Sequence, residues 1–197
     1  MIKSMLSSEI TDNKWYKSML AGNYPSFSDY EFISTAFGTG SSAVITFSSI
    51  PQDYRHLQIR YVGKNTTNSN DVYITMNGVS SGVYMSHRLW GNGTTVAVTP
   101  SGTASQTFII LTDALAISTT ADCFGAGVID ILDYPSTTKN KTVRAIYGVS
   151  DASSAGPGSN LTSGLYAQTT AVSSLTFTTA TGNFTSLTRF SLYGIKG

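Results

Sequence analysis

From Glu31 onward, the sequence consists of short segments rich in Val, Ile, Tyr, Phe and Thr, each bounded by Gly, Pro, Asn or Ser. Apolar and polar residues often alternate, as in Leu57-Gln-Ile-Arg-Tyr61, and this alternation is typical of a β-strand with one buried face. No helical pattern interrupts the segments. They predict about twelve strands, at residues 31–37, 42–48, 55–62, 71–77, 83–90, 94–98, 106–111, 125–133, 141–149, 163–168, 172–179 and 188–195.

Many short strands without helices predict a two-sheet sandwich or a barrel. The turns between the predicted strands vary in length, which favours a jelly roll over an up-and-down barrel. Loops are expected at 63–70, 99–105 and 150–162. Tight turns are expected at Asn92-Gly93 and Asn77-Gly78, because Asn and Gly tolerate positive φ. The predicted fold class is therefore an all-β, jelly-roll-like antiparallel β-sandwich.

An alternating run from Phe190 to Ile195 continues to within two residues of the end of the sequence. Terminal residues are usually frayed, so this pattern predicts a strand that is paired inside a sheet. Residues 173–178 alternate in the same way and lie one loop upstream. We therefore expect a hairpin between residues 173–178 and the terminal run.

The chain is nearly neutral: 12% of its 197 residues are charged, and its formal net charge is +1. Nucleic-acid binding requires clustered Lys and Arg, and beyond the first 20 positions only Lys139 and Lys141 form a close pair. We therefore expect no nucleic-acid partner. Residues 1–20 hold no apolar run long enough to span a bilayer, so we expect no membrane insertion. Cys123 is the only cysteine, which excludes an intrachain disulfide and a cysteine-based zinc site.

Residues 1–28 differ from the strand-rich remainder. Trp15, Met19 and Leu20 recur at helical spacing, which predicts a helix of two to three turns. A helix this short is marginal without a surface to pack on, and that surface could be its own sandwich or another subunit. We accordingly divide the chain into an N-terminal attachment segment, 1–28, and a β-sandwich domain, 29–197.

No catalytic or metal-binding set stands out. Asp53 and His56 could supply two ligands, but a metal site needs three or four, so neither a metal nor another cofactor is expected. Asp130 and Asp133 are the best acid pair, yet their odd spacing places them on opposite faces of a strand. The next predicted strand would instead place Arg144 beside Asp130, as an ordinary cross-strand ion pair. We expect no enzymatic activity.

The aromatic segment from Tyr84 to Trp90 is the best candidate binding site. Tyr84, Ser86, Arg88 and Trp90 share one strand face, just before the Asn92-Gly93 turn. Aromatic rings with polar neighbours can stack on sugars and hydrogen-bond their hydroxyls, although the same pattern fits a half-buried strand. The candidate glycan-binding residues are therefore Tyr84, Arg88 and Trp90, with an ordinary structural strand as the alternative.

Six stretches together form a fairly specific combination: Ile45–Pro51, Tyr54–Arg60, Trp90–Gly93, Phe124–Tyr134, Lys139–Arg144 and Phe190–Gly197. This combination resembles a family of small β-sandwich proteins encoded by tailed bacteriophages. The resemblance covers residues from about Asp29 to the end, and leaves residues 1–28 outside it.

The resemblance implies a virion protein without catalytic residues, and a fibre or appendage subunit is the preferred interpretation. By analogy with such proteins, we expect a homo-oligomer with threefold closure. We also expect contacts with other virion proteins through residues 1–28. Two alternatives remain: a carbohydrate-binding module that recognises a host receptor, and a capsid decoration or cement protein.

Overall fold

The structure is a computed structural model that describes residues 29–117, 122–149 and 158–197. The helix expected within residues 1–28 lies outside the described residues. The described chain is all-β, as predicted. Its strands are β1 (Tyr30–Phe37), β2 (Val44–Phe47), β3 (His56–Gly63), β4 (Val72–Met76), β5 (Tyr84–Gly91), β6 (Val96–Gln106), β7 (Ile109–Leu111), β8 (Gly125–Leu132), β9 (Lys141–Val149), β10 (Gly158–Tyr166), β11 (Leu175–Thr179) and β12 (Arg189–Ile195).

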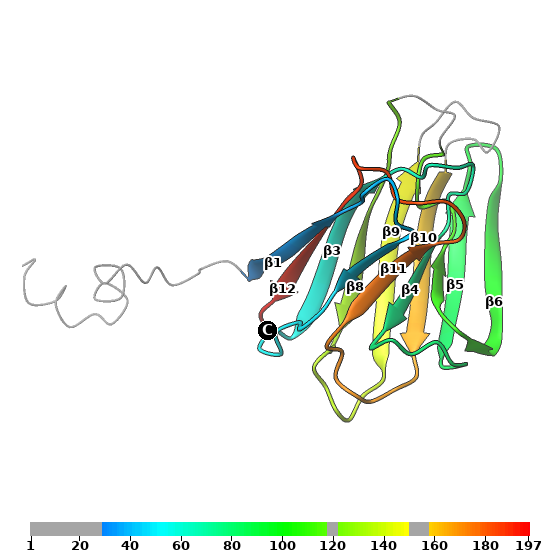
Figure 1. The fold of residues 1–197 in the computed structure, drawn as a ribbon. Helices are drawn as coiled ribbons and strands as arrows, with labels where there is room; N and C mark the ends of the chain where they lie inside the picture. The colour runs from blue at the N-terminus through cyan, green and yellow to red at the C-terminus, as the bar shows by residue number, and fades with distance from the viewer. Residues whose placement is uncertain (1–28, 118–121, 150–157) are drawn as a thin grey trace, which may run out of the picture.

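The strands form two antiparallel sheets that stack as a sandwich, which confirms the predicted fold class (Figure 1). The large sheet has eight strands in the order β1-β12-β3-β8-β9-β10-β5-β6, and the small sheet has four in the order β2-β11-β4-β7. Buried and more exposed residues alternate along β4 and β9, as the two-residue period of a strand requires. We call the face of the large sheet that packs on the small sheet the inner face, and the opposite side the outer face.

Aromatic rings from both sheets meet in the core. Phe190 of β12 stacks on Tyr61 of β3 with 5.0 Å between ring centroids, and its centroid lies 4.7 Å from that of Phe177 in the small sheet. Phe184 packs edge-on against Phe190 at 5.6 Å. All four rings are buried, and burying an aromatic side chain contributes about 2–3 kcal/mol. The terminal run is therefore a core strand.

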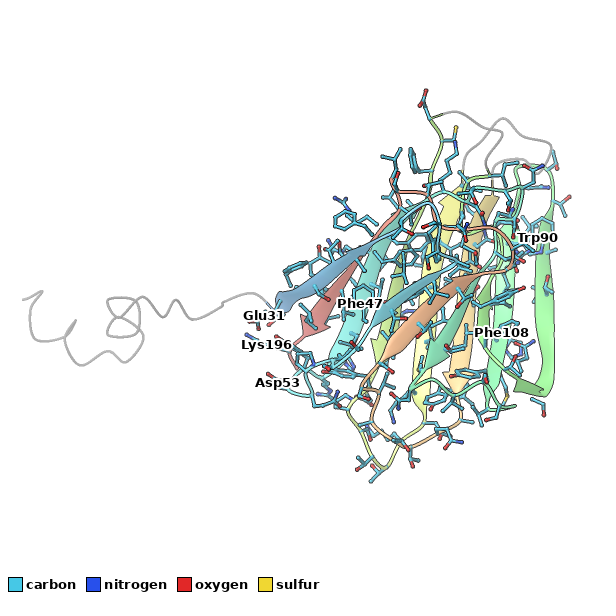
Figure 2. The ribbon with its side chains drawn as sticks, viewed as in Figure 1. Glu31, Phe47, Asp53, Trp90, Phe108 and Lys196 are labelled. Carbon is cyan, nitrogen blue, oxygen red and sulfur yellow. The ribbon has the colours of Figure 1, made fainter. Side chains whose placement is uncertain are left out.

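The expected hairpin between residues 173–178 and the terminal run is wrong. β11 pairs with β2 and β4 in the small sheet, whereas β12 lies between β1 and β3 in the large sheet. The physical reason is that Phe177 and Phe190 face each other across the core, so their strands must belong to opposite sheets. At the outer end of β1 and β12, Glu31 and Lys196 form an ion pair at 3.0 Å (Figure 2).

Two expected loops are partly strands. β6 covers residues 99–105, and β10 begins at Gly158, inside the expected loop 150–162. These segments are rich in Ser, Gly and Thr, which predicted loops. β6 lies at a sheet edge, where a strand tolerates Pro100, and β10 is paired on both sides, with β9 and β5.

The two expected tight turns are confirmed. The Asn92 N–H donates to the Thr95 carbonyl at 3.1 Å and closes the β5–β6 hairpin, with Gly93 at a φ of 89°. Asn77 and Gly78 have φ values of 53° and 67°, and their turn carries the chain from the small sheet to the large one. The expected cross-strand pair is also confirmed: Asp130 and Arg144 are direct neighbours in the β8–β9 register, with 3.4 Å between Arg144 Nη2 and Asp130 Oδ2.

A buried lysine holds the loops at one end of the sandwich. Lys141 has no exposed surface, and its ammonium donates to the carbonyl oxygens of Ser136, Lys139 and Thr169 at 2.6, 2.6 and 2.9 Å. Buried charge is tolerated only where such partners replace water. Lys141 thus joins the loop after β8 to the loop after β10.

We predict that Lys141→Met lowers the free energy of unfolding by about 2–3 kcal/mol, because the carbonyl oxygens lose their donor. Urea unfolding followed by circular dichroism measures this loss. Lys139→Met is the matched control, since its exposed pair with Asp133 contributes less than about 1 kcal/mol. Equal losses in the two variants would contradict a stabilising role for the buried ammonium.

Candidate functional site

Tyr84, Arg88 and Trp90 share one face of β5, as predicted, and this is the inner face. Tyr84 is fully buried. Its hydroxyl accepts from the Met76 N–H at 2.8 Å and donates to the Val79 carbonyl at 3.0 Å. Burial raises the pKa of Tyr84 to about 12. Tyr84 therefore supports the core from within, and only Arg88 and Trp90 are partly exposed.

Arg88 is the centre of a polar cluster. Its guanidinium lies 3.1 Å from Asp113 Oδ2 and 5.3 Å from the centroid of the Trp90 ring, close enough for a cation–π contact. Asp113 Oδ1 accepts from the Asn70 amide at 2.7 Å. Figure 2 places Trp90 near the β5–β6 side of the sandwich. We call Arg88, Trp90, Asn70, Asp71 and Asp113 the Arg88 cluster.

Asp71 adds a second carboxyl to this cluster. Its Oδ1 accepts from the Asp113 N–H at 3.2 Å. Burial raises the pKa of Asp71 above its ordinary value, and the negative charge of Asp113 raises it further, against the lowering effects of this hydrogen bond and of Arg88. The sandwich therefore holds a proton on Asp71 more tightly than the unfolded chain does.

The buried side chain of Asn160 lies next to this cluster. It is the direct cross-strand neighbour of Trp90 and is 4% exposed. Within the described part of the chain, neither its amide nitrogen nor its amide oxygen has a hydrogen-bond partner. Buried polar groups are nearly always paired, so Asn160 marks a place where a polar ligand group could be accommodated.

We predict that Asp71→Asn gains stability relative to the unchanged chain as the pH rises from about 4 to about 7. Because the pKa of Asp71 is raised in the folded state, the protonated carboxyl contributes to the free energy of unfolding at low pH. The unchanged chain loses this contribution as the carboxyl ionises, and the Asn variant has no such contribution to lose. Urea midpoints measured across this pH range test the difference. A difference between variant and unchanged chain that stays constant with pH would contradict the raised pKa.

Asp130 and Asp133, the acid pair considered in the sequence, each form ion pairs or hydrogen bonds with different neighbouring side chains. Asp130 binds Arg144 and also accepts from the Gln58 amide at 2.9 Å. A hydrogen bond from Lys139 at 2.9 Å lowers the pKa of Asp133. His56 Nδ1 accepts from the Asp133 N–H at 2.9 Å. Among the described residues, no group of three or more His, Cys, Asp or Glu side chains could hold a metal ion.

A row of apolar side chains crosses the outer face of the large sheet. The strand register makes its members direct neighbours in the order Val128, Ile146, Leu161, Leu89 and Val98. Their exposed fractions are 37, 65, 39, 45 and 67% in that order. We call these five residues the apolar row. A continuous exposed apolar patch across several strands typically marks an interaction site.

A second row, two residues along each strand, has almost no side chains. In register it contains Ala126, Gly148, Ser159 and Gly91 on four strands, which we call the shallow row, and it ends on β6 at Val96, which is 80% exposed. Because it lies beside the apolar row, the outer face has a ridge next to a trough. A pocket of about 320 Å³ opens there, lined by Leu89, Trp90, Gly91, Val96, Ser159, Asn160 and Leu161.

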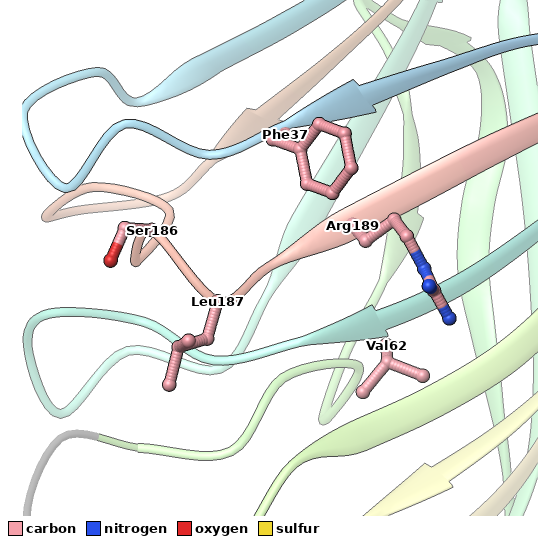
Figure 3. A pocket seen from close by; sticks show the side chains of 5 residues that line it. All are labelled: Phe37, Val62, Ser186, Leu187 and Arg189. Atoms are coloured by element: carbon pink, nitrogen blue, oxygen red, sulfur yellow. The ribbon is translucent and has the colours of Figure 1, made fainter.

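The same cross-strand row continues to the far edge of the sheet. There Phe37 is paired with Arg189, and Arg189 with Val62. These three residues, with Ser186 and Leu187, line a pocket of about 260 Å³ (Figure 3). Phe37 and Leu187 are 61% and 71% exposed. The outer face thus offers apolar pockets at both ends of the trough.

The sequence pattern indicated the Arg88 cluster only in part, and it did not indicate the apolar row. Arg88 and Trp90 stand out by residue type, whereas Asp71, Asp113 and Asn160 join them only through folding. Four of its strands contribute one exposed aliphatic residue each, and β6 has two, Val96 and Val98, so no single segment outlines the patch. The available clue was that Ile146 and Leu161 are apolar residues on the exposed side of strands whose burial alternates.

No known protein family matches the chain, and no curated protein does. Among solved structures, a galectin of Caenorhabditis elegans is similar with a TM-score of 0.33 and 7% identity, over 88% of this chain and 99% of that one. A protein of unknown function from Shewanella oneidensis MR-1 is similar with a TM-score of 0.25 and 9% identity, over 84% of this chain and 75% of that one. Neither likeness is strong enough to carry an argument.

The class of protein that the described fold defines is an antiparallel β-sandwich with a row of exposed apolar side chains on its outer face. Within the residues that the structure describes, no helix is long and apolar enough to cross a membrane.

Proposed function

We propose that this chain is a non-enzymatic structural subunit of a bacteriophage virion, which works through contacts with other proteins. The observation that carries the proposal is the apolar row, a continuous exposed strip over five strands of an otherwise ordinary sandwich. A protein that acts by chemistry needs converging reactive groups, whereas a subunit needs a broad, uncharged surface. A fibre or appendage subunit is the specific role we propose, and capsid decoration is its variant.

The phage resemblance supports this proposal through the same sheet. The stretches Phe124–Tyr134, Lys139–Arg144 and Phe190–Gly197 contain all of β8, the first part of β9, and most of β12. These strands lie in the large sheet that carries the apolar row. The resemblance therefore falls mainly in the large sheet, and Val128 is the residue of the apolar row that lies within its stretches.

The direct test is to label phage particles from the strain that carries this sequence. Antibodies raised against the purified chain, followed by electron microscopy, should mark the surface of the head or the tail. Particles that contain no copy of the chain by mass spectrometry would contradict the proposal.

Residues 1–28 are the proposed connection to the rest of the particle. We predict that a variant lacking residues 1–28 keeps the β-sheet circular dichroism of the full chain but no longer joins particles, since the sandwich begins at β1. Complementation of a phage that lacks the full chain provides the assay, with the full chain as control. Loss of the β-sheet signal would mean instead that residues 1–28 complete the core.

Carbohydrate binding is the second candidate function, and the Arg88 cluster favours it. Trp90 offers a ring, Arg88 and Asp113 offer charged hydrogen-bonding groups, and the Asn160 amide has no hydrogen-bond partner among the described residues. This combination suits a sugar, which stacks through its C–H face and hydrogen-bonds through its hydroxyls. Tyr84, the third residue of the sequence prediction, would support the site from the core.

If this site binds glycans, Trp90→Ala should weaken binding about tenfold or more, because the stacking surface is lost. Binding to host surface polysaccharide is measured by calorimetry, and circular dichroism verifies the fold. His87→Ala is the matched control, as it changes an exposed neighbour on the opposite face of β5. Unchanged affinity in a folded Trp90→Ala protein would remove the Arg88 cluster from consideration.

A further inference from the structure

We propose that the outer face of the large sheet binds an acidic polysaccharide, with an anionic group of the sugar chain between Arg60 and Arg189. The two arginines lie on β3 and β12, three strands away from β5 and the Arg88 cluster, which is on the inner face. Polysaccharide binding at this place goes beyond the proposed function and does not depend on it. The charges, the fixed hydrogen-bond donors and the neighbouring rings of the site support it.

Two arginines lie close together on this face. Buried Phe190 lies between Arg189 and Ser191 in β12, so both of these point to the outer face. Arg60 of β3 is the cross-strand neighbour of Ser191. Arg60 and Arg189 are thus diagonal neighbours, about 7–8 Å apart at Cα and within reach of long side chains. Both are exposed, and within the described parts of the chain neither forms an ion pair. Since their like charges repel each other, an anion between them is attracted by both.

The guanidinium of Arg60 is held in place by its neighbours. Its Nε donates to Gln58 Oε1 at 2.9 Å, and Gln58 in turn donates to Asp130 at 2.9 Å. The guanidinium lies 5.3 Å from the centroid of the Tyr193 ring and 5.8 Å from that of Tyr30, within cation–π range. Its terminal nitrogens donate to no acceptor among the described residues. They are therefore available, in a fixed position, to bind two oxygens of a carboxylate or a phosphate.

A small pocket opens between the two arginines. Its volume is about 140 Å³, and it is lined by Arg60, Tyr61, Val62, Arg189, Ser191 and Tyr193. The Ser191 hydroxyl shares a hydrogen bond of 2.9 Å with the hydroxyl of Thr35 in β1. Because a hydroxyl has one donor and two acceptor sites, Ser191 can still hydrogen-bond a ligand. The pocket thus combines two cations with a neutral hydroxyl.

Apolar surface lies on both sides of this pocket. The pocket shares Val62 and Arg189 with the larger one described above, and Figure 3 shows Arg189 between Phe37 and Val62. Toward the other end of β1, Phe32 packs edge-on against Tyr193 with 5.9 Å between centroids. Phe32 and Phe37 are 60% and 61% exposed. Rings that flank an anion pocket suit a chain of sugars, which stack through their C–H faces.

The surroundings favour a polysaccharide over a peptide or a nucleic acid. A peptide that adds to a sheet needs an open strand edge, whereas β3 and β12 are paired on both sides. A nucleic acid carries a phosphate on every nucleotide and requires a line of cations. Arg144, another arginine of the outer face, is already paired with Asp130 at 3.4 Å. The site therefore suits a ligand whose negative charges are separated by neutral sugar units.

Calorimetric titration of the purified full chain with two acidic polymers tests this site. Hyaluronan oligosaccharides carry carboxylates that alternate with neutral sugars, and phosphorylated dextran carries phosphates. At least one of them should bind, and the comparison of the two shows which anionic group the site prefers. Methyl-esterified hyaluronan and plain dextran are the matched neutral polymers and should not bind. Inorganic phosphate alone should bind more weakly, because it leaves the rings uncovered.

Arg60→Gln and Arg189→Gln should each weaken binding about tenfold or more, because each removes charge-assisted hydrogen bonds to the anion. Arg144→Gln is the matched control, since it removes the same charge from the same face, and it should change the affinity much less. Phe37→Ser should weaken binding of the polymer and leave that of inorganic phosphate unchanged. Circular dichroism of each variant verifies the fold.

Four results would overturn the proposal: no binding of either acidic polymer, equal losses in the three arginine variants, inorganic phosphate binding as tightly as the polymers, or tighter binding of polyglutamate or oligothymidylate than of both polymers. Specific binding by a chain that is missing from virions would leave the polysaccharide site standing while removing the proposed function.

Discussion

The contact between Phe190 and Phe177 is the interaction on which the rest of the structure depends. With 4.7 Å between their centroids, these rings join β12 of the large sheet to β11 of the small sheet. Tyr61 and Phe184 extend the contact on either side of Phe190. Because side chains alternate along a strand, fixing Phe190 inward also fixes Arg189 and Ser191 outward. The inner core therefore determines which residues form the outer face.

The two faces of the large sheet have different chemical character as a result. The inner face ends in the Arg88 cluster, where charged groups are partly buried and paired. The outer face carries aliphatic side chains in water at Ile146 and Val98, which are 65% and 67% exposed. Exposed aliphatic residues are common singly, but neighbours in one continuous row need a partner to cover them.

The sequence predicted the elements well because strand signals are local. Alternation located the strands, and the Asn-Gly pairs located two turns. The positions of Asp130 and Arg144 on two successive predicted strands placed these residues beside each other. It misplaced β11, because alternation is the same in either sheet and only the packing of Phe177 on Phe190 distinguishes them. It missed the start of β10, because pairing with two neighbours outweighs the low strand propensity of Gly158 and Ser159.

The sequence did not predict those features of the candidate sites that depend on which strands pair and in which register. Tyr84 shares a face with Trp90, as expected, but that face is the buried one, and nothing in the residue types distinguishes the two faces. The apolar row needs four strand pairings, between β8, β9, β10, β5 and β6, and one of them, β10 with β5, joins strands far apart in the sequence. Those pairings follow from the whole fold and from no single segment.

The most direct test of the account asks whether the apolar row is a contact surface in the assembled particle. Ile146→Lys places a charge in the centre of the row and should abolish incorporation into particles in the complementation assay, while circular dichroism shows that the sandwich is intact. Thr142→Lys adds the same charge at an exposed position of β9 outside the row and should join particles as the unchanged chain does. Equal incorporation of the two variants would contradict the account.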